Sequence, residues 1–282
     1  MTLLKYNSFS IDYADRQHLA LFFFVYTALR MVLEGRFNRQ QMSYFQYLLF
    51  SFYSVLKWME KLLVLLFLIY GCYAEHQDLS GKKFIIPVET SNSFVKLSGN
   101  ISKPVTAMTM CQRFFTEEHR DQSLFSLATP SDPKDINLCM QSKGGYKLNI
   151  RGNSVTISGL PENRNAWISF CGTWDSKTGL TQMWANGRRS ASKILKPNGP
   201  INGKPSIILG QNQGSYGGSF VASQSFVGDV TDVHFWDSVI SPCQIKLYMQ
   251  GKNFTPGNIL NWKALEFTTG GGVFKEISDY NC

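Results

Sequence analysis

Short runs in which apolar and polar residues alternate fill the chain from Lys82 onward, and most of these runs end at Gly, Pro, Asn or Ser. Successive side chains of a strand point to opposite faces, so this period of two is typical of antiparallel strands with one buried face. Asn186-Gly187 separates two such runs and predicts a tight hairpin turn. The pattern therefore predicts an all-β fold, a two-sheet antiparallel sandwich. The clearest runs are SFVKLSG, YKLNIRGNSVTISG, AWISFCGTW, LTQMWANGRR, PSIILGQ and VGDVTDVHFWD.

One segment departs from this pattern and predicts a short α-helix. The run SPCQIKLYMQG begins with Ser241 as a cap, places Pro242 at the first helical position, keeps apolar residues at helical spacing and ends at Gly251. No linker or internal repeat divides residues 75–282. We therefore expect one sandwich domain over residues 75–282 that carries one short helix.

Residues 59–74, MEKLLVLLFLIYGCYA, have the layout of a secretory signal peptide. They combine a methionine, a lysine, an apolar run and small residues before the expected cleavage position. The apolar run is shorter than the ~20 residues of a membrane-spanning helix. The prediction is a secreted, extracellular protein whose mature chain begins near residue 75.

Residues 1–58 precede this signal and contain the aromatic-rich runs HLALFFFVYTALRMVL and YFQYLLFSFYSVL. Each run is interrupted or too short to cross a bilayer comfortably. Either these runs are membrane-associated segments, or translation begins at Met59 and residues 1–58 are an upstream extension. We favour the second interpretation, an artefact of the gene model, and expect no integral membrane association. A membrane-tethered form is the alternative.

Lys and Arg outnumber Asp and Glu by 28 to 20, which gives a net charge of +8. The excess is spread along the chain without a run of basic residues, so we expect no specific nucleic-acid partner. Anionic ligands are compatible with this charge.

A secreted chain permits disulfides, and five cysteines remain after the signal. Because five is odd, at least one is free or pairs between chains. Asn100-Ile101-Ser102 is an acceptor triplet for N-glycosylation, and Asn253-Phe254-Thr255 is a second that Pro256 weakens. The five cysteines are Cys111, Cys139, Cys171, Cys243 and Cys282.

No pattern of catalytic residues is present after residue 75, and we expect a protein that is not an enzyme. Neither G-x-S-x-G nor H-E-x-x-H occurs, and the histidines lack the spacing of metal ligands. The acidic residues fall in turns or at polar strand positions, where solvated charge is the simpler interpretation. These histidines are His76, His119 and His234, and the acidic residues include Glu117, Glu118, Asp229 and Asp232.

The run SFCGTWDS, residues 169–176, resembles the signature of the pentraxin family, His-x-Cys-x-Ser/Thr-Trp-x-Ser/Thr. It departs from this signature at Ser169, where the family has histidine. The chain looks like serum amyloid P component and C-reactive protein in further stretches over the whole mature part. These stretches are DLSGKKF, IILGQNQGSYGG, SQSFVGDV, FWDSVISP and NILNWKALEF.

The resemblance implies a lectin-like jelly-roll sandwich that is secreted and assembles into a flat ring of five identical subunits. It implies innate-immune, acute-phase recognition through calcium ions on one face. It also implies a disulfide between Cys111 and Cys171. For the other cysteines, a bond between Cys243 and Cys282 and a link between subunits both stay open.

The calcium positions that the resemblance implies have lost most of their negative charge here. Asp135, Gln213 and Gln224 keep the family residue, and Asn212 offers a neutral oxygen. Calcium takes 6 to 8 oxygens and is bound more tightly as carboxylates are added, so we expect weak or absent calcium binding. The other family positions are Ile136, Gly214 and Val221.

Phosphocholine recognition does not carry over from the resemblance, because the run GNSVTIS lacks a carboxylate and Gln141 or Met140 replaces an apolar pocket wall. We expect instead a pattern-recognition or scavenging protein for carbohydrate or anionic, phosphorylated ligands on microbial or damaged-cell surfaces. Arg188, Arg189 and Lys193 are candidate contacts. The alternative is a structural or interaction ring whose ligand face is vestigial.

Overall fold

The computed structural model describes residue 30 and residues 39–70, 76–99, 101–195 and 199–280. The chain divides into two compact units, Met1–Tyr73 and Ala74–Cys282, and each is described by itself. In the first unit, helix α2 spans Arg39–Tyr70 and so runs through position 59, where we expect translation to begin. Among the described residues, no helix combines the length and apolar character that crossing a bilayer requires. The signal peptide and the upstream extension remain predictions.

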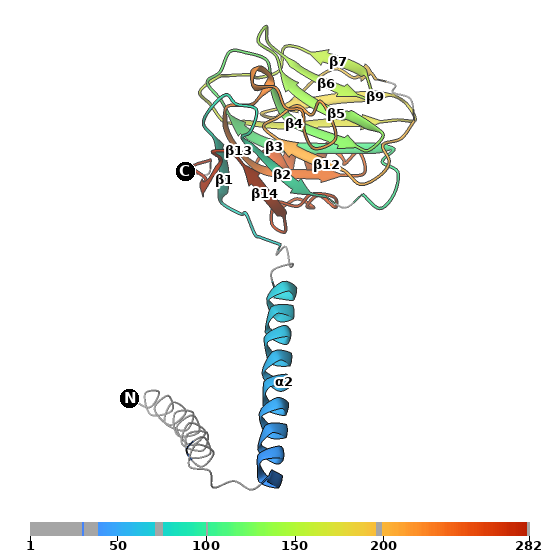
Figure 1. Cartoon of the computed structure of the whole chain (residues 1–282). Helices are drawn as coiled ribbons and strands as arrows, with labels where there is room; N and C mark the ends of the chain where they lie inside the picture. The colour runs from blue at the N-terminus through green and yellow to red at the C-terminus, as the bar shows by residue number, and fades with distance from the viewer. Residues whose placement is uncertain (1–29, 31–38, 71–75, 100, 196–198, 281–282) are drawn as a thin grey trace, which may run out of the picture. The chain divides into compact units, whose positions relative to one another are not determined.

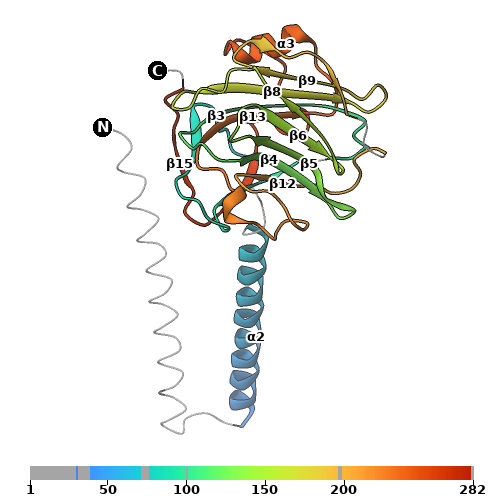
Figure 2. The same cartoon turned by 90° about the horizontal axis from the view of Figure 1, so that it is seen from above.

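The second unit is a sandwich of two antiparallel sheets (Figures 1 and 2), which confirms the predicted fold class. One sheet has eight strands in the order β10-β9-β8-β3-β13-β1-β15, with β11 paired to β9. Its strands are β1 (Lys82–Ile86), β3 (Ala107–Phe115), β8 (Ile168–Asp175), β9 (Leu180–Ala185), β10 (Arg188–Arg189), β11 (Lys193–Ile194), β13 (Gly228–Trp236) and β15 (Phe274–Ile277).

The other sheet has seven strands in the order β14-β2-β12-β4-β5-β6-β7. Its strand order departs from the chain order because β12 inserts between β2 and β4, which makes residues far apart in sequence neighbours in the sheet. Its strands are β2 (Phe94–Ser98), β4 (Gln122–Thr129), β5 (Asp132–Met140), β6 (Tyr146–Ile150), β7 (Asn153–Ile157), β12 (Ser206–Leu209) and β14 (Glu266–Gly270).

Aromatic rings join the two sheets across the core. Phe125 of β4 stacks on Phe235 of β13 with ring centroids 5.9 Å apart, and Tyr146 of β6 contacts Phe170 of β8 at 4.6 Å. These side chains are fully buried, as the alternation of the strands predicts. Burial of apolar surface between the sheets supplies most of the stabilisation of such a fold.

The predicted helix is α3, Pro242–Met249, which lies along the eight-stranded sheet beside β8 and β9 (Figure 2). The hydroxyl of Ser241 caps it by accepting a hydrogen bond from the backbone N–H of Gln244 at 3.3 Å. The predicted hairpin turn is also present: Asn186 and Gly187 both have positive φ, 44° and 81°, which suits Asn and Gly.

The predicted disulfide between Cys111 and Cys171 is present. The two cysteines lie directly opposite each other on β3 and β8, with Cα atoms 4.1 Å apart. Cys139 and Cys243 are free thiols, and Cys282 lies outside the described residues, so the possible bond from Cys243 to Cys282 stays a prediction.

A buried guanidinium organises the outer side of the eight-stranded sheet. Arg113 of β3 is 2% exposed and lies between the rings of Tyr248 and Tyr280, 4.5 and 4.3 Å from their centroids. It donates to Asp232 at 2.9 Å and also to Ser169, the residue that departs from the family signature. The smaller serine thus serves as an acceptor for a buried cation, which needs such partners.

The carboxylate of Asp232 has a lowered pKa. Burial alone would raise this pKa, but the hydrogen bond and charge of His234 and the charge of Arg113 outweigh it. A carboxyl whose pKa is lower when folded stabilises the fold at neutral pH and loses that contribution as pH falls through the folded pKa.

We predict that Asp232→Asn lowers the free energy of unfolding by about 1–3 kcal/mol at pH 7, because a charged partner of Arg113 is lost. The deficit relative to the wild type begins to shrink near the unfolded pKa of about 4 and goes on shrinking as the pH falls through the lower pKa of the folded carboxylate. Urea unfolding from pH 7 to pH 3 measures both effects, with the exposed Glu276→Gln as control. A deficit that stays constant over this range contradicts the prediction.

Candidate functional site

The outer face of the seven-stranded sheet carries polar side chains at the centre of strands β5 and β6. Strand register places Asn137 opposite Asn149 and Cys139 opposite Lys147. The alternate positions, such as Leu138, are buried in the core. Because neighbouring strands hold residues of one face side by side, these four polar side chains form one surface.

The segment that follows β12, residues 210–227, is pinned to this sheet by two buried amides. The Gln211 side chain donates to the backbone carbonyls of Thr90 and Ser93 at 2.6 and 2.8 Å. The Gln213 side chain donates to the hydroxyl of Ser126 at 3.1 Å and to the Ser206 carbonyl at 3.0 Å, and its oxygen accepts from the Gly217 N–H at 2.9 Å. Both side chains are fully buried. These two glutamines therefore fix the loop in place.

A chain of side-chain hydrogen bonds links this loop to the face of β5. The Ser123 hydroxyl donates to Asn137 Oδ1 at 2.8 Å, Asn137 Nδ2 donates to Asn212 Oδ1 at 2.7 Å, and Asn212 Nδ2 donates to Gln224 Oε1 at 2.6 Å. Gln224 belongs to the 3-10 helix η1, Ala222–Gln224. Each amide oxygen of the chain therefore already accepts a hydrogen bond from its neighbour.

A hollow of about 450 Å³ opens over this hydrogen-bond chain. Its lining includes Asn137, Asn212 and Gln224 together with the side chains of Lys134 and Lys147. Neither lysine makes a side-chain hydrogen bond or an ion pair with any described residue. The two ammonium groups thus form no ion pair, and they line a hollow that also holds neutral amides and the carboxylate of Asp121, whose charge interacts with Lys147.

The hollow has one carboxylate, Asp121, and it is held by the backbone. Asp121 accepts hydrogen bonds from the Ser142 N–H at 2.7 Å and from Gln141 Nε2 at 3.4 Å. The Ser142 hydrogen bond is the main reason for its lowered pKa. The carboxylate is therefore charged at neutral pH and already engaged at the rim.

Cys139 lines the same hollow as a free thiol. Burial raises the pKa of this thiol to about 12, against a smaller opposing effect of Lys147. The thiolate is the reactive form of cysteine, so this side chain is protonated and unreactive at neutral pH.

The structure brings together two of the four residues expected at the calcium positions. Asn212 and Gln224 are hydrogen-bonded in the hollow, whereas Gln213 is buried beneath the loop. Asp135 does not line the hollow: it is fully buried in β5, accepts a hydrogen bond from Thr129 and pairs with Arg151, whose Nε is 3.3 Å from Oδ1. Burial raises its pKa.

Asn100, the expected glycosylation acceptor, lies outside the described residues. Within the described part of the chain, no group of three or more His, Cys, Asp or Glu side chains could hold a metal ion.

Lys134 and Lys147 line the hollow but are not among the site residues expected from the sequence. A signal for Lys147 exists in the run YKLNI, whose alternation assigns Lys147 and Asn149 to the outer face of the sheet. For Lys134 there is no such signal, because its position in the hollow depends on how the loop after β12 folds back. The sequence also left open whether Gln141 or Met140 faces the ligand side: Gln141 lines the hollow and Met140 is fully buried.

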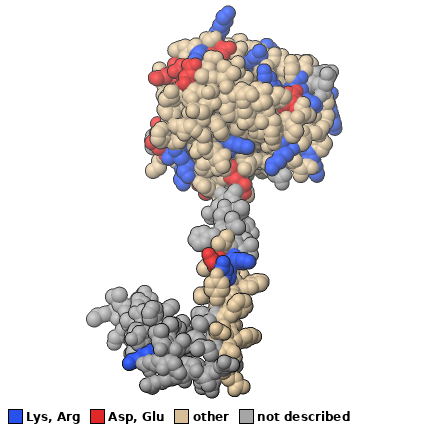
Figure 3. Space-filling view, viewed as in Figure 1, with Lys and Arg blue, Asp and Glu red and all other residues tan. Residues whose placement is uncertain are grey.

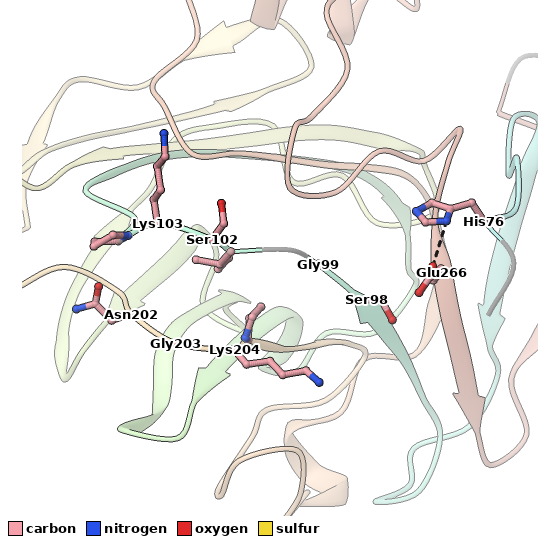
Figure 4. A pocket seen from close by; sticks show the side chains of 12 residues that line it. His76, Ser98, Gly99, Ser102, Lys103, Asn202, Gly203, Lys204 and Glu266 are labelled. Carbon is pink, nitrogen blue, oxygen red and sulfur yellow. Dashed lines mark ion pairs between the residues drawn. The ribbon is translucent and has the colours of Figure 1, made fainter. Parts of the chain in front are cut away.

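A second hollow of about 750 Å³ lies beside β2 and β14 (Figure 4). His76 pairs there with Glu266 at 3.1 Å, and Lys103 and Lys204 extend in different directions (Figure 4). This hollow is larger than the hollow over Asn212. Its two lysines do not point toward one place, so they do not form a common site for an anion.

Basic residues elsewhere on the unit are dispersed. On the face seen in Figure 3, Lys and Arg are scattered among neutral residues and do not form one patch. Arg188 and Arg189 form the exposed strand β10 at the edge of the eight-stranded sheet, and Lys193 Nζ donates to the Thr156 carbonyl at 2.6 Å. These three residues therefore do not belong to the hollow.

Comparisons with known proteins give the relationship of the chain. The Pentaxin family model matches residues 82–276. Human C-reactive protein is 38% identical over 219 residues, which cover 77% of this chain and 97% of that protein. Mouse serum amyloid P-component is 35% identical over 218 residues, which cover 76% and 96%. A native heptameric SAP-like pentraxin from Limulus polyphemus has the same fold, with a TM-score of 0.66, 21% identity, and coverage of 72% and 98%.

We predict that Gln213→Ala lowers the free energy of unfolding by about 1–3 kcal/mol, because it leaves buried partners without hydrogen bonds. It also speeds hydrogen exchange of the amides in residues 210–227. The control is Gln224→Ala in the same loop, whose exposed side chain gives a change within about 0.5 kcal/mol. Urea unfolding and exchange mass spectrometry measure both, and equal effects of the two changes would refute the structural role of Gln213.

Proposed function

The chain belongs to the pentraxin family, and from that premise we propose that it is a secreted binding protein of innate immunity. It recognises carbohydrate or anionic, phosphorylated ligands on microbial or damaged-cell surfaces. The observation that carries the proposal is the hollow over Asn137, Asn212 and Gln224, a polar site held by a pinned loop. The relatives' 35–39% identity over most of the family's length supports it.

The proposed activity is binding without catalysis. In the hollow, the only sulfur nucleophile among the lining residues is the protonated thiol of Cys139. His234, which is fully buried, has both ring nitrogens engaged, Nε2 with Asp232 at 3.2 Å and Nδ1 with the Gly257 N–H at 3.3 Å. These arrangements support binding chemistry only.

Calcium, the cofactor that the family implies, does not fit the residues at this site. Calcium requires several oxygens turned toward one point, with carboxylates to balance its charge. The oxygens of Asn137, Asn212 and Gln224 each accept a hydrogen bond from a neighbouring side chain, and two lysines add positive charge. We therefore propose that calcium binding is weak or lost and that ligands bind without it.

We further propose that the mature chain assembles as a homo-oligomer, with five subunits as the expected number, and carries a glycan at Asn100. The Limulus relative is heptameric, so subunit number varies within the fold. A ring with a vestigial ligand face is the alternative function. A membrane-tethered form is the alternative localisation, which N-terminal sequencing of secreted material would distinguish.

For calcium, we expect calorimetric titration of the purified protein to show no binding with a Kd below about 1 mM. Asp135→Asn leaves the titration unchanged, because this buried carboxylate pairs with Arg151. Saturable heat below 1 mM that disappears in Asp135→Asn would restore the calcium site predicted from the sequence.

For surface recognition, we expect the purified protein to sediment with killed bacteria or with apoptotic cells in buffer containing EDTA. Asn212→Leu, which breaks the hydrogen-bond chain at its centre, reduces the bound fraction severalfold. The exposed Ile277→Ser in β15, on the other sheet, is the matched control. Failure to bind any surface, with or without calcium, would favour the vestigial-face alternative.

A further inference from the structure

We propose that Arg120 is a positioning residue of the candidate site. It holds the backbone on both sides of Gln224 and thereby fixes the end of the side-chain hydrogen-bond chain that runs through Asn212. The inference rests on the proposed function and concerns the same site. Arg120 is absent from the described residues that line the hollow, so its effect on a ligand passes through Gln224.

The first argument is where Arg120 meets the loop. Its Nη1 donates to the backbone carbonyl of Ser225 at 2.6 Å and, at a longer distance of 3.5 Å, to that of Ser223. These two carbonyls flank Gln224, whose Oε1 accepts the hydrogen bond from Asn212 Nδ2 at 2.6 Å. One guanidinium group therefore holds the backbone directly before and after the residue that ends the chain.

The second argument is that this turn has little support of its own. Gln224 belongs to the 3-10 helix η1, none of whose residues is buried and whose N-cap, Val221, makes no side-chain hydrogen bond. A 3-10 turn has poorer hydrogen-bond geometry than an α-helix and is used in short pieces. The position of Gln224 therefore depends on contacts from outside the turn.

The two flanks of this turn are held by other groups. The buried amides of Gln211 and Gln213 hold the first half of the loop. At the end of the loop, the backbone N–H of Val227 donates to Gln122 Oε1 at 3.0 Å. Loss of the Arg120 side chain would therefore free the turn and leave both flanks in place.

The third argument is how Arg120 is itself held. Its Nε lies 3.2 Å from a carboxylate oxygen of Glu118 and 3.3 Å from one of Glu89, and the side chain is only 22% exposed. Glu89 precedes β2 and Glu118 precedes β4, so the guanidinium joins three loops that are far apart in sequence. Arginine suits this position because its planar group presents several donors in fixed directions, whereas lysine has one ammonium group on a flexible stem.

Hydrogen exchange of the whole purified protein, followed by mass spectrometry, tests the positioning without a ligand. The amides of residues 224–226 are hydrogen-bonded around the turn, and those of residues 214–218 include bonds within the first half of the loop. Arg120→Met speeds exchange at 224–226 about tenfold, the usual effect of losing one hydrogen bond to a charged group, and leaves 214–218 unchanged. Glu118→Gln acts in the same direction, with its exposed neighbour Glu117→Gln as the matched control.

Unchanged exchange of residues 224–226 in Arg120→Met overturns the inference. Equal acceleration of residues 214–218 also overturns it, because the arginine would then support the loop as a whole and not the turn at Gln224. Urea midpoints establish that each variant is folded.

Binding tests whether the position of Gln224 matters to the site. The readout is the half-saturating concentration of protein on killed bacteria in EDTA. Arg120→Met raises this concentration severalfold, and Arg120→Lys restores part of the loss because it keeps a cation near the carbonyls. The double variant Arg120→Met/Asn212→Leu binds no more weakly than Asn212→Leu alone, because both changes act through one hydrogen-bond chain. Additive effects of the two changes, which a general loss of stability would give, overturn the inference.

The control for the lost charge is Lys177→Met, which removes an exposed cation between β8 and β9 of the other sheet and leaves binding unchanged. A wild type that binds no surface contradicts the proposed function, and the exchange experiment then decides on Arg120 by itself. Surface binding that Arg120→Met leaves unchanged overturns this inference alone.

Discussion

In each sheet of this sandwich, the side chains of the inner face pack in the core and those of the outer face lie on the surface. This division determines where the site lies. Strand alternation sends Leu138 and Leu148 into the core and leaves Asn137 and Asn149 on the outer face of the seven-stranded sheet. The inner residues are fixed by packing against the other sheet, whereas the outer residues are free to change without loss of the fold. Ligand chemistry can therefore change on a face whose backbone stays the same.

The side chains of the loop over this face are divided in the same way, into buried ones and ones that line the hollow. Gln211 and Gln213 are buried and hold the backbone of the loop, so they fix its shape. Asn212 and Gln224 point into the hollow and determine what it can hold. The amides that support the loop are thus different from those that line the hollow.

Much of the fold could be predicted from the sequence, because period-two alternation, the Asn186-Gly187 turn and the Ser241-Pro242 cap act locally. The site could be predicted only in part. Asn212 and Gln224 were identified through the family resemblance, but the burial of Asp135 against Thr129 and Arg151 depends on contacts among three strand ends. The position of Lys134 in the hollow likewise depends on the folded loop, which local sequence does not encode.

The central claim is that the amides of this pentraxin face do not hold calcium, because too few carboxylates converge there. A crystal structure of the protein grown in millimolar calcium tests it most directly. We expect no calcium ion on Asn212 or Gln224. A calcium ion held by these two side chains would contradict the claim.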